Sequence, residues 1–179
     1  MASTDPVSAV VVRIALPAPL ARRRAHRDWA ASVGVPPHVT VLFPFVPAAR
    51  LVPAVRRELA AVARMVEPFE VRFERVGRFS NVVYLAPEPA APFAALTEAV
   101  TARFPDFLPY GGVFDVVLPH LTITESVADD VRESVLDEIA VQAGRALPFG
   151  ARVSRLEVLV EGDDGRWRRR WRVPLGVRP

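Results

Sequence analysis

The sequence of 179 residues contains no cysteine, which excludes disulfide bridges, thiolate zinc sites, iron–sulfur clusters and a cysteine nucleophile. Because nothing indicates an oxidising compartment, we expect a cytoplasmic protein. No run reaches the ~18 uncharged apolar residues that a membrane-spanning helix needs, so no membrane attachment is expected. The apolar segment Val7–Leu20 contains Arg13, and further arginines follow it, which reverses the charge order of a signal peptide.

Lysine is also absent, so all 23 basic residues are arginines. With 20 acidic residues in the chain, the net charge is only +3. A composition that is rich in arginine and free of lysine is typical of codon bias in a GC-rich genome. It does not by itself indicate nucleic-acid binding. Arginine nevertheless binds phosphate well where several side chains gather, so the position of each cluster matters.

The hydrophobic content is high enough for a substantial core. Hydrophobic residues make up 51% of the chain, and a chain of this length buries roughly two-thirds of its unfolded surface. Intrinsic disorder and a fibrous structure are therefore excluded. At about 150 residues per domain the length predicts one domain, residues 1–179, and no low-complexity linker divides it. We expect a monomer.

Strand and helix patterns alternate along the chain. Strands are expected at 10–16, 38–45, 69–76, 82–85, 120–124, 153–161 and, after a turn at Gly162–Gly165, 166–173. Helices are expected at 20–33, 47–66, 89–104 and 129–143, with a loop at 105–119. Segments 10–19 and 82–89 are both apolar strands that end in Pro-x-Pro ahead of a helix. This repeat suggests two βαβ-type halves, although chance self-similarity explains it equally well.

Two of the three histidines lie in nearly identical segments, Pro37-His38-Val39-Thr40 and Pro119-His120-Leu121-Thr122. One His-x-Thr would carry no information, whereas a matched pair indicates selection. With the two-residue period of a strand, His38, Thr40 and Leu42 share one face, as do His120, Thr122 and Thr124. The opposite face is apolar and belongs against helices, so both histidines are expected to face a common cleft.

Other roles for the histidines are less favoured by the sequence. A single histidine on a strand is most often a hydrogen-bonded core residue or an inconsequential surface residue. A zinc site would need further ligands, for which Asp115 and Glu125 are the available carboxylates, and no metal is expected. His26 lies in an arginine-rich helix and is expected to be a solvated position.

Two imidazoles that titrate near neutrality can act as base and acid within one turnover. Threonine hydroxyls can donate hydrogen bonds to phosphoryl oxygens, over which the charge of the reacting phosphate is spread. Phosphodiester chemistry at a ribose fits this set of side chains without a metal.

The paired His-x-Thr motifs, about eighty residues apart, resemble those of the 2H phosphoesterase superfamily, and segments 36–45, 76–87 and 110–124 resemble its 2′-5′ RNA ligase-like branch. The resemblance spans nearly the whole chain. It implies an α+β fold with two similar lobes, antiparallel sheets lining a central cleft and helices outside. It also implies 2′,3′-cyclic nucleotide or RNA phosphodiesterase activity, and 2′-5′ RNA ligation as the reverse of RNA cleavage. His38 and His120 would be the acid–base pair, and Thr40 and Thr122 would anchor the phosphate.

Several further residues are candidates for substrate contact. Tyr110, in a Pro-Tyr-Gly-Gly loop, and Phe79, beside Asn81, can stack on a base or cap the cleft, although packing is the commoner role of such aromatics. Arg78 is a weaker candidate for a phosphate contact. In the terminal hairpin, Trp167, Arg169 and Trp171 are expected on one face and four other arginines on the other. This pattern fits RNA binding or, more commonly, a charged edge strand.

The sequence therefore predicts a cofactor-free enzyme whose substrates are cyclic nucleotides or RNA ends. Two alternatives stay open. The same cleft can belong to an RNA-end-binding module without turnover, or to a hydrolase of another small cyclic phosphate. Turnover separates the first alternative from the prediction, and a substrate panel separates the second.

Overall fold

The computed structural model describes residues 6–79, 81–125 and 133–176. Its eight strands form one antiparallel sheet in the order β6-β3-β4-β5-β2-β1-β7-β8. The strands are β1 (Ser8–Arg13), β2 (His38–Leu42), β3 (Phe69–Arg78), β4 (Val82–Glu88), β5 (Leu121–Glu125), β6 (Phe149–Val153), β7 (Arg155–Glu161) and β8 (Trp167–Pro174). The helices are α1 (Ala18–Arg27), α2 (Trp29–Ser32), α3 (Pro53–Arg64), α4 (Ala91–Arg103) and α5 (Glu133–Gly144), with short 3₁₀ turns at Ala48–Arg50 and Pro109–Gly112.

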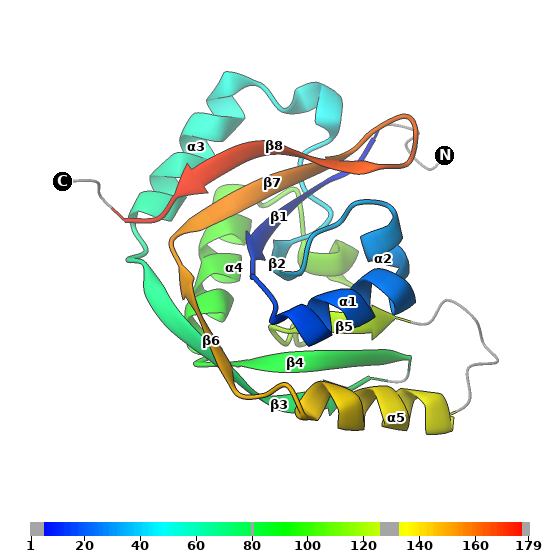
Figure 1. The fold of residues 1–179 in the computed structure, drawn as a ribbon. Coiled ribbons are helices and arrows are strands. Elements are labelled where there is room, and N and C mark those ends of the chain that lie inside the picture. The colour runs from blue at the N-terminus through cyan, green and yellow to red at the C-terminus, as the bar shows by residue number, and fades with distance from the viewer. Residues whose placement is uncertain (1–5, 80, 126–132, 177–179) are drawn as a thin grey trace.

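The sheet consists of two similar halves that meet at β2 and β5. On one side β1, β7 and β8 follow β2, and on the other β4, β3 and β6 follow β5. Each half contains the predicted strand–helix–strand unit, β1-α1-β2 and β4-α4-β5, and each helix packs against the histidine strand of the other half. Figure 1 shows the strong curl of the sheet and the segment from β6 to β7 crossing from one half to the other. The α+β fold and the internal repeat are confirmed.

The main core lies on the helix-covered face of the sheet. It unites residues of β1–β5 with buried side chains of α1, α3, α4 and α5, among them Leu20, Leu59, Phe93 and Ile139. A second, smaller cluster lies on the opposite face around Ala9, Val11 and Leu159, with the half-buried Val35, Phe43 and Trp167 packed against it. The histidine strands therefore have one face in the main core and one face outside it.

Three segments differ from the expectation. The helix predicted at 20–33 breaks at Asp28, whose extended backbone begins α2 and whose side chain accepts a hydrogen bond from the backbone of Ala31. The helix predicted at 47–66 begins with a 3₁₀ turn, and α3 proper starts at Pro53, a favoured first position. The strand predicted at 153–161 is β7, which begins at Arg155, and the edge strand β6 before it was not predicted, since Pro148 and Gly150 weaken its strand pattern.

The terminal hairpin has a bulge at Arg170, because Val158 pairs with Trp171 while the next residue, Leu159, pairs with Arg169. The bulge reverses the alternation along β8. Trp171 consequently packs on the main core, whereas Trp167 packs on the smaller cluster of the opposite face. The prediction that both tryptophans share one face with Arg169 is therefore wrong.

The helix predicted at 129–143 is α5, and its first predicted residues lie outside the described part of the chain. No helix among the described residues is long and apolar enough to cross a membrane.

Candidate active site

The two Pro-His-x-Thr segments lie side by side at the centre of the sheet. β2 and β5 pair antiparallel through Val39 and Leu121, the residues that directly follow the two histidines. In an antiparallel pair, the next positions on either side set Thr40 opposite His120 and His38 opposite Thr122. Residues directly opposite each other have Cβ atoms about 5 Å apart. The fold thus brings all four side chains to one place.

The two imidazoles make the same hydrogen bond. The Nδ1–H of His38 donates to the carbonyl oxygen of Pro36 at 2.7 Å, and that of His120 donates to the carbonyl oxygen of Leu118 at 2.8 Å. Because a carbonyl oxygen can only accept, the hydrogen of each neutral ring lies on Nδ1. Nε2 is then the nitrogen that remains for proton exchange with a substrate in both residues.

A β-bulge follows each threonine and changes which face the next residues occupy. Val10 pairs with Leu42 and Val11 with Thr40, so Val41 is the extra residue. In β5 the extra residue is Ile123, since Val83 pairs with Thr124 and Tyr84 with Thr122. Each bulge moves one residue from the histidine face to the core face.

The predicted faces are therefore wrong for Leu42, Phe43 and Thr124, whereas Val41, Phe45 and Ile123 lie in the main core as expected. Leu42 lies in the main core, while Phe43 packs on the opposite face. Thr124 is buried and donates from its hydroxyl to the carbonyl oxygen of Arg27 at 2.7 Å. The shared polar face is limited to His38, Thr40, His120 and Thr122.

A buried arginine ties the two motifs together. Arg24 of α1 donates from Nη1 to the carbonyl oxygen of Val35 at 2.8 Å and from Nε to that of Thr122 at 3.3 Å. Its Nη2 pairs with the Asp28 carboxylate at 2.8 Å, and both side chains are almost fully buried. Burial lowers the pKa of Arg24 and raises that of Asp28, and the attraction between their charges opposes both shifts.

His38 is held in its neutral form. Its pKa is lowered from 6.5 to about 4, chiefly by burial, which the hydrogen bond to Pro36 opposes and the charges of Arg24 and His120 reinforce. The contribution of His120 is consistent with the closeness of the two rings across the strand pair. At neutral pH the His38 imidazole is therefore a proton acceptor.

His120 lies instead among aromatic rings. Phe79 stacks on Tyr84 with ring centroids 4.5 Å apart, and these rings meet His120 edge to face at 5.2 and 5.5 Å. The stack depends on Gly77, which pairs with Tyr84 across β3 and β4. A Cβ at Gly77 would lie 2.2 Å from Cζ of Tyr84, so only glycine leaves room for that ring.

Tyr110 reaches the site from the loop between α4 and β5. Its backbone is left-handed at φ 51°, and Gly111 and Gly112 continue the left-handed turn. A tyrosine in this conformation is strained, as residues at functional sites often are. Burial raises the pKa of Tyr110, and a hydrogen bond with the Thr40 side chain opposes that shift.

A cavity of about 460 Å³ opens beside His120. The predicted residues Phe79, Tyr110, His120 and Thr122 line it, together with Asn81 and the exposed apolar loop that carries Phe114. His38 and Thr40 are not among its lining residues, but Thr40 is hydrogen-bonded to Tyr110, which lines it. Arg78, the weaker candidate, pairs with Asp137 of α5.

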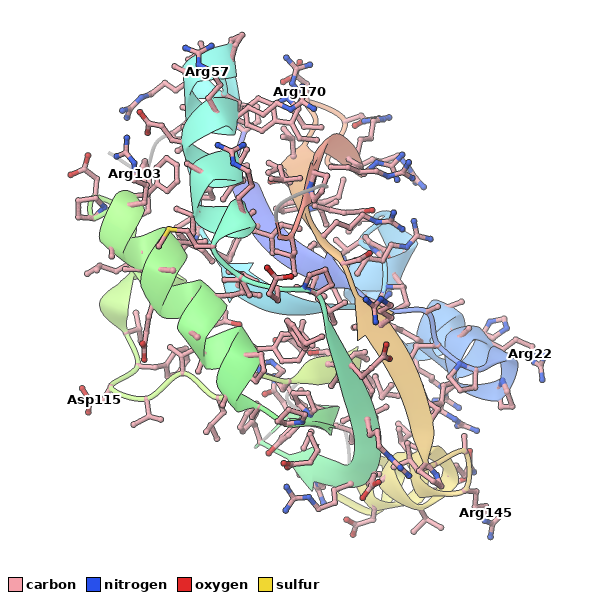
Figure 2. The ribbon with its side chains drawn as sticks, turned by 90° about the vertical axis from the view of Figure 1, so that its left-hand side faces the viewer. Arg22, Arg57, Arg103, Asp115, Arg145 and Arg170 are labelled. Atoms are coloured by element: carbon pink, nitrogen blue, oxygen red, sulfur yellow. The ribbon has the colours of Figure 1, made fainter. Side chains whose placement is uncertain are left out.

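The residues considered for a zinc site are dispersed. Among the described residues, no three histidine or carboxylate side chains gather in a way that would hold a metal ion. Asp115 projects from an exposed loop (Figure 2), Glu125 lies at the cavity, and His26 is exposed on α1.

The sequence did not point to four residues of this site, which are Arg24, Asp28, Gly77 and Tyr84. Arg24 is one of 23 arginines, and its only signal is the four-residue spacing to Asp28, which fits an ion pair on a helix. Tyr84 and Gly77 form one feature across two strands, and their pairing becomes visible only when the register is known.

Comparisons with known proteins identify the family of this chain. The family model of the 2′-5′ RNA ligase superfamily matches residues 12–165. Proteins of Bacillus licheniformis and Bacillus pumilus, each named "Putative phosphoesterase", are 24% and 27% identical over 141 residues, which cover 74% of this chain and 76% and 75% of theirs.

The fold is also similar to solved structures. The Thermus thermophilus protein TT0787 matches with a TM-score of 0.63 at 18% identity, over 96% of this chain and 100% of that one. E. coli LigT in complex with 3′-AMP matches with a TM-score of 0.58 at 16% identity, over 97% and 99%. With its family model matched over most of its length, the chain belongs to the 2′-5′ RNA ligase superfamily of 2H phosphoesterases.

Proposed function

We propose that the protein is a metal-independent phosphoesterase that opens 2′,3′-cyclic phosphates of nucleotides or RNA ends, and that the same site supports 2′-5′ RNA ligation. The observation that carries this proposal is the matched pair of imidazoles. Each donates its Nδ1–H to the carbonyl oxygen two residues before it, and each is the histidine of a Pro-His-x-Thr segment. E. coli LigT, which has a similar fold, has been crystallised with 3′-AMP, a nucleoside phosphate.

The different surroundings of the two histidines suggest how they divide the work. A neutral His38, with its pKa lowered to about 4, accepts the proton of the attacking water at Nε2. The water oxygen bonds to phosphorus, the bond from phosphorus to one ribose oxygen breaks, and His120 donates its Nε2 proton to that oxygen. A pair of titratable groups in contrasting environments commonly divides acid and base roles in this way.

The threonines and the cavity complete the proposed site. Thr40 and Thr122 lie across from the two histidines, where their hydroxyls can donate to the non-bridging phosphoryl oxygens. The nucleoside is assigned to the cavity beside His120, because aromatic side chains there can stack on a base.

Turnover of defined substrates tests the proposal. Purified protein is incubated with the four 2′,3′-cyclic nucleotides and with cyclic-phosphate-ended RNA, before and after EDTA treatment. Ring opening to monophosphates that survives chelation is the expected result. RNA binding without turnover would contradict the proposal and favour an RNA-end-binding module, and activity lost on chelation but restored by zinc would contradict the metal-independent mechanism.

A further inference from the structure

A second cavity, of about 240 Å³, lies on the His38 side of the site. We call it the arginine pocket; it is lined by Arg13, Gly34, Pro36, Glu157, Leu159 and Arg169. Arg13 pairs directly with His38 across β1 and β2, and Pro36 accepts the hydrogen bond from the His38 ring. The pocket thus adjoins His38 as the larger cavity adjoins His120.

The pocket carries an excess of positive charge around one buried carboxylate. Glu157 is 1% exposed and has Arg172, Arg169 and Arg155 at 3.5, 3.8 and 4.0 Å. Arg13 forms no ion pair within the described residues. Three guanidinium groups surround the carboxylate and Arg13 adds a fourth positive charge to the pocket lining, which leaves capacity for a further anion. Guanidinium is well suited to phosphate.

The arginine pocket is built into the fold. The backbone N–H of Trp167 donates to the carbonyl oxygen of Val33 at 2.8 Å, and a Cβ at Gly34 would lie 2.9 Å from the carbonyl oxygen of Trp167. Close approach of the two backbones fastens β8 to the segment that precedes His38. Because the bulge at Arg170 turns both Arg169 and Arg172 toward Glu157, these two side chains do more than shield a sheet edge.

We propose that the arginine pocket binds a backbone phosphate of an RNA strand whose 5′-hydroxyl lies against His38. This inference rests on the proposed function and names the second substrate. Displacement at phosphorus is in line, so the nucleophile approaches opposite the leaving ribose oxygen. With the nucleoside of the cyclic phosphate in the His120 cavity, the nucleophile and the chain attached to it lie on the His38 side.

Ligation to this strand needs no further reactant. The 5′-hydroxyl gives its proton to His38 as its oxygen bonds to phosphorus, the bond from phosphorus to O3′ breaks, and His120 protonates O3′. The product is a 2′-5′ linkage, and the same path in reverse cleaves it. Water needs no phosphate contact, so the arginine pocket distinguishes an RNA nucleophile from water.

Binding of a 5′-hydroxyl RNA heptamer, labelled at its 3′ end and followed by fluorescence anisotropy from 50 to 200 mM salt, tests the arginine pocket. The test variant is R13Q/R169Q, in which Arg155 and Arg172 still pair with Glu157. R57Q is the control for losing an arginine away from the pocket, because Arg57 is exposed on α3 and points away from the sheet (Figure 2). R13K/R169K restores charge without the planar group, and thermal melting checks that each variant is folded.

We expect R13Q/R169Q to bind about tenfold more weakly than R57Q at 50 mM salt, with a shallower salt dependence. Each lost phosphate contact lowers the slope of log K against log salt by about 0.7 for a single strand. R13K/R169K should recover most of that slope. Equal affinity of R13Q/R169Q and R57Q would overturn the arginine pocket alone. Absence of cyclic-nucleotide turnover in the wild type would overturn the proposed function and, with it, the placement of the bound strand beside His38.

Discussion

His38 and His120 occupy equivalent positions in the two halves of the sheet, yet their surroundings differ. Both rings donate to the carbonyl oxygen two residues earlier, and both strands bulge directly after the threonine. His38, however, is half-buried near the charge of Arg24 and beside the arginine pocket, whereas His120 contacts aromatic rings beside an open, largely apolar cavity. The repeated scaffold places two like groups, and the side chains around them give the two rings unlike environments.

The largest expected effect tests whether the two halves act as one unit. His38→Ala or His120→Ala should each lower kcat by about 10²–10⁴-fold, because either change removes one of the two proposed proton transfers. The double variant should be little worse than either single variant, since members of a catalytic unit are not additive. Steady-state kinetics on a 2′,3′-cyclic nucleotide provides the measurement.

His26→Ala is the control for this series, because His26 is exposed on α1. All variants should melt near the wild-type temperature. A histidine variant that unfolds but retains its specific activity would assign that residue to the core instead of the reaction.

The second prediction concerns the contacts between the halves. α4 packs on β2 through apolar side chains, whereas α1 packs on β5 partly through the buried pair of Arg24 and Asp28. Arg24→Met should cost about 3–5 kcal/mol of unfolding free energy in urea, because it leaves a buried carboxylate without its partner. Arg24→Met combined with Asp28→Leu should recover much of that loss. An exposed control, Arg22→Met, should cost little.

The sequence predicted the fold and the grouping of His38, Thr40, His120 and Thr122, because both follow from local sequence patterns. Apolar alternation marks the strands, and the repeated Pro-His-x-Thr marks the pair. The bulges at Val41, Ile123 and Arg170 are not local patterns, since each exists only relative to the neighbouring strand. Faces were therefore predicted correctly as far as each threonine and wrongly for Leu42, Phe43 and Thr124 beyond it.

Residues that act through tertiary contacts have no local sequence pattern that would reveal them. Arg24 carries no mark that separates it from the solvated arginines of its helix until α1 is packed on β5. Gly77 has an ordinary strand position in the sequence, and its role follows from the ring of Tyr84 above it. The arginine pocket likewise depends on β1, β7 and β8 lying side by side.

The third prediction uses pH to sharpen the contrast between the two histidines. The pKa of His38 falls from 6.5 to about 4 on folding, so the unfolded chain binds more protons between these values. The free energy of unfolding therefore decreases as pH falls from 6.5 to 4, because protonation of His38 favours the unfolded chain. The upper limit of this decrease is about 3 kcal/mol. His38→Gln should remove this acid-dependent loss, as measured by urea unfolding from pH 7 to 4. His26→Gln retains His38 and should retain the loss; equal pH dependence in both variants would refute the assignment.

The smallest effects distinguish the two threonines. Thr40→Val and Thr122→Val should each cost about 1–3 kcal/mol in kcat/KM, because a charge-assisted donor to the phosphoryl oxygens is lost. Tyr110 interacts with Thr40, while Thr122 lies in the other motif, so the halves should differ in their coupling to Tyr110. Tyr110→Phe should be non-additive with Thr40→Val and additive with Thr122→Val, within about 0.5 kcal/mol, in a double-mutant cycle on kcat/KM. Additivity in both pairs would mean that Tyr110 acts independently of Thr40, and unchanged kinetics in both valine variants would mean that the threonines serve only the strands. Coupling confined to Thr40 would show that the asymmetry extends from the histidines to the hydroxyls beside them.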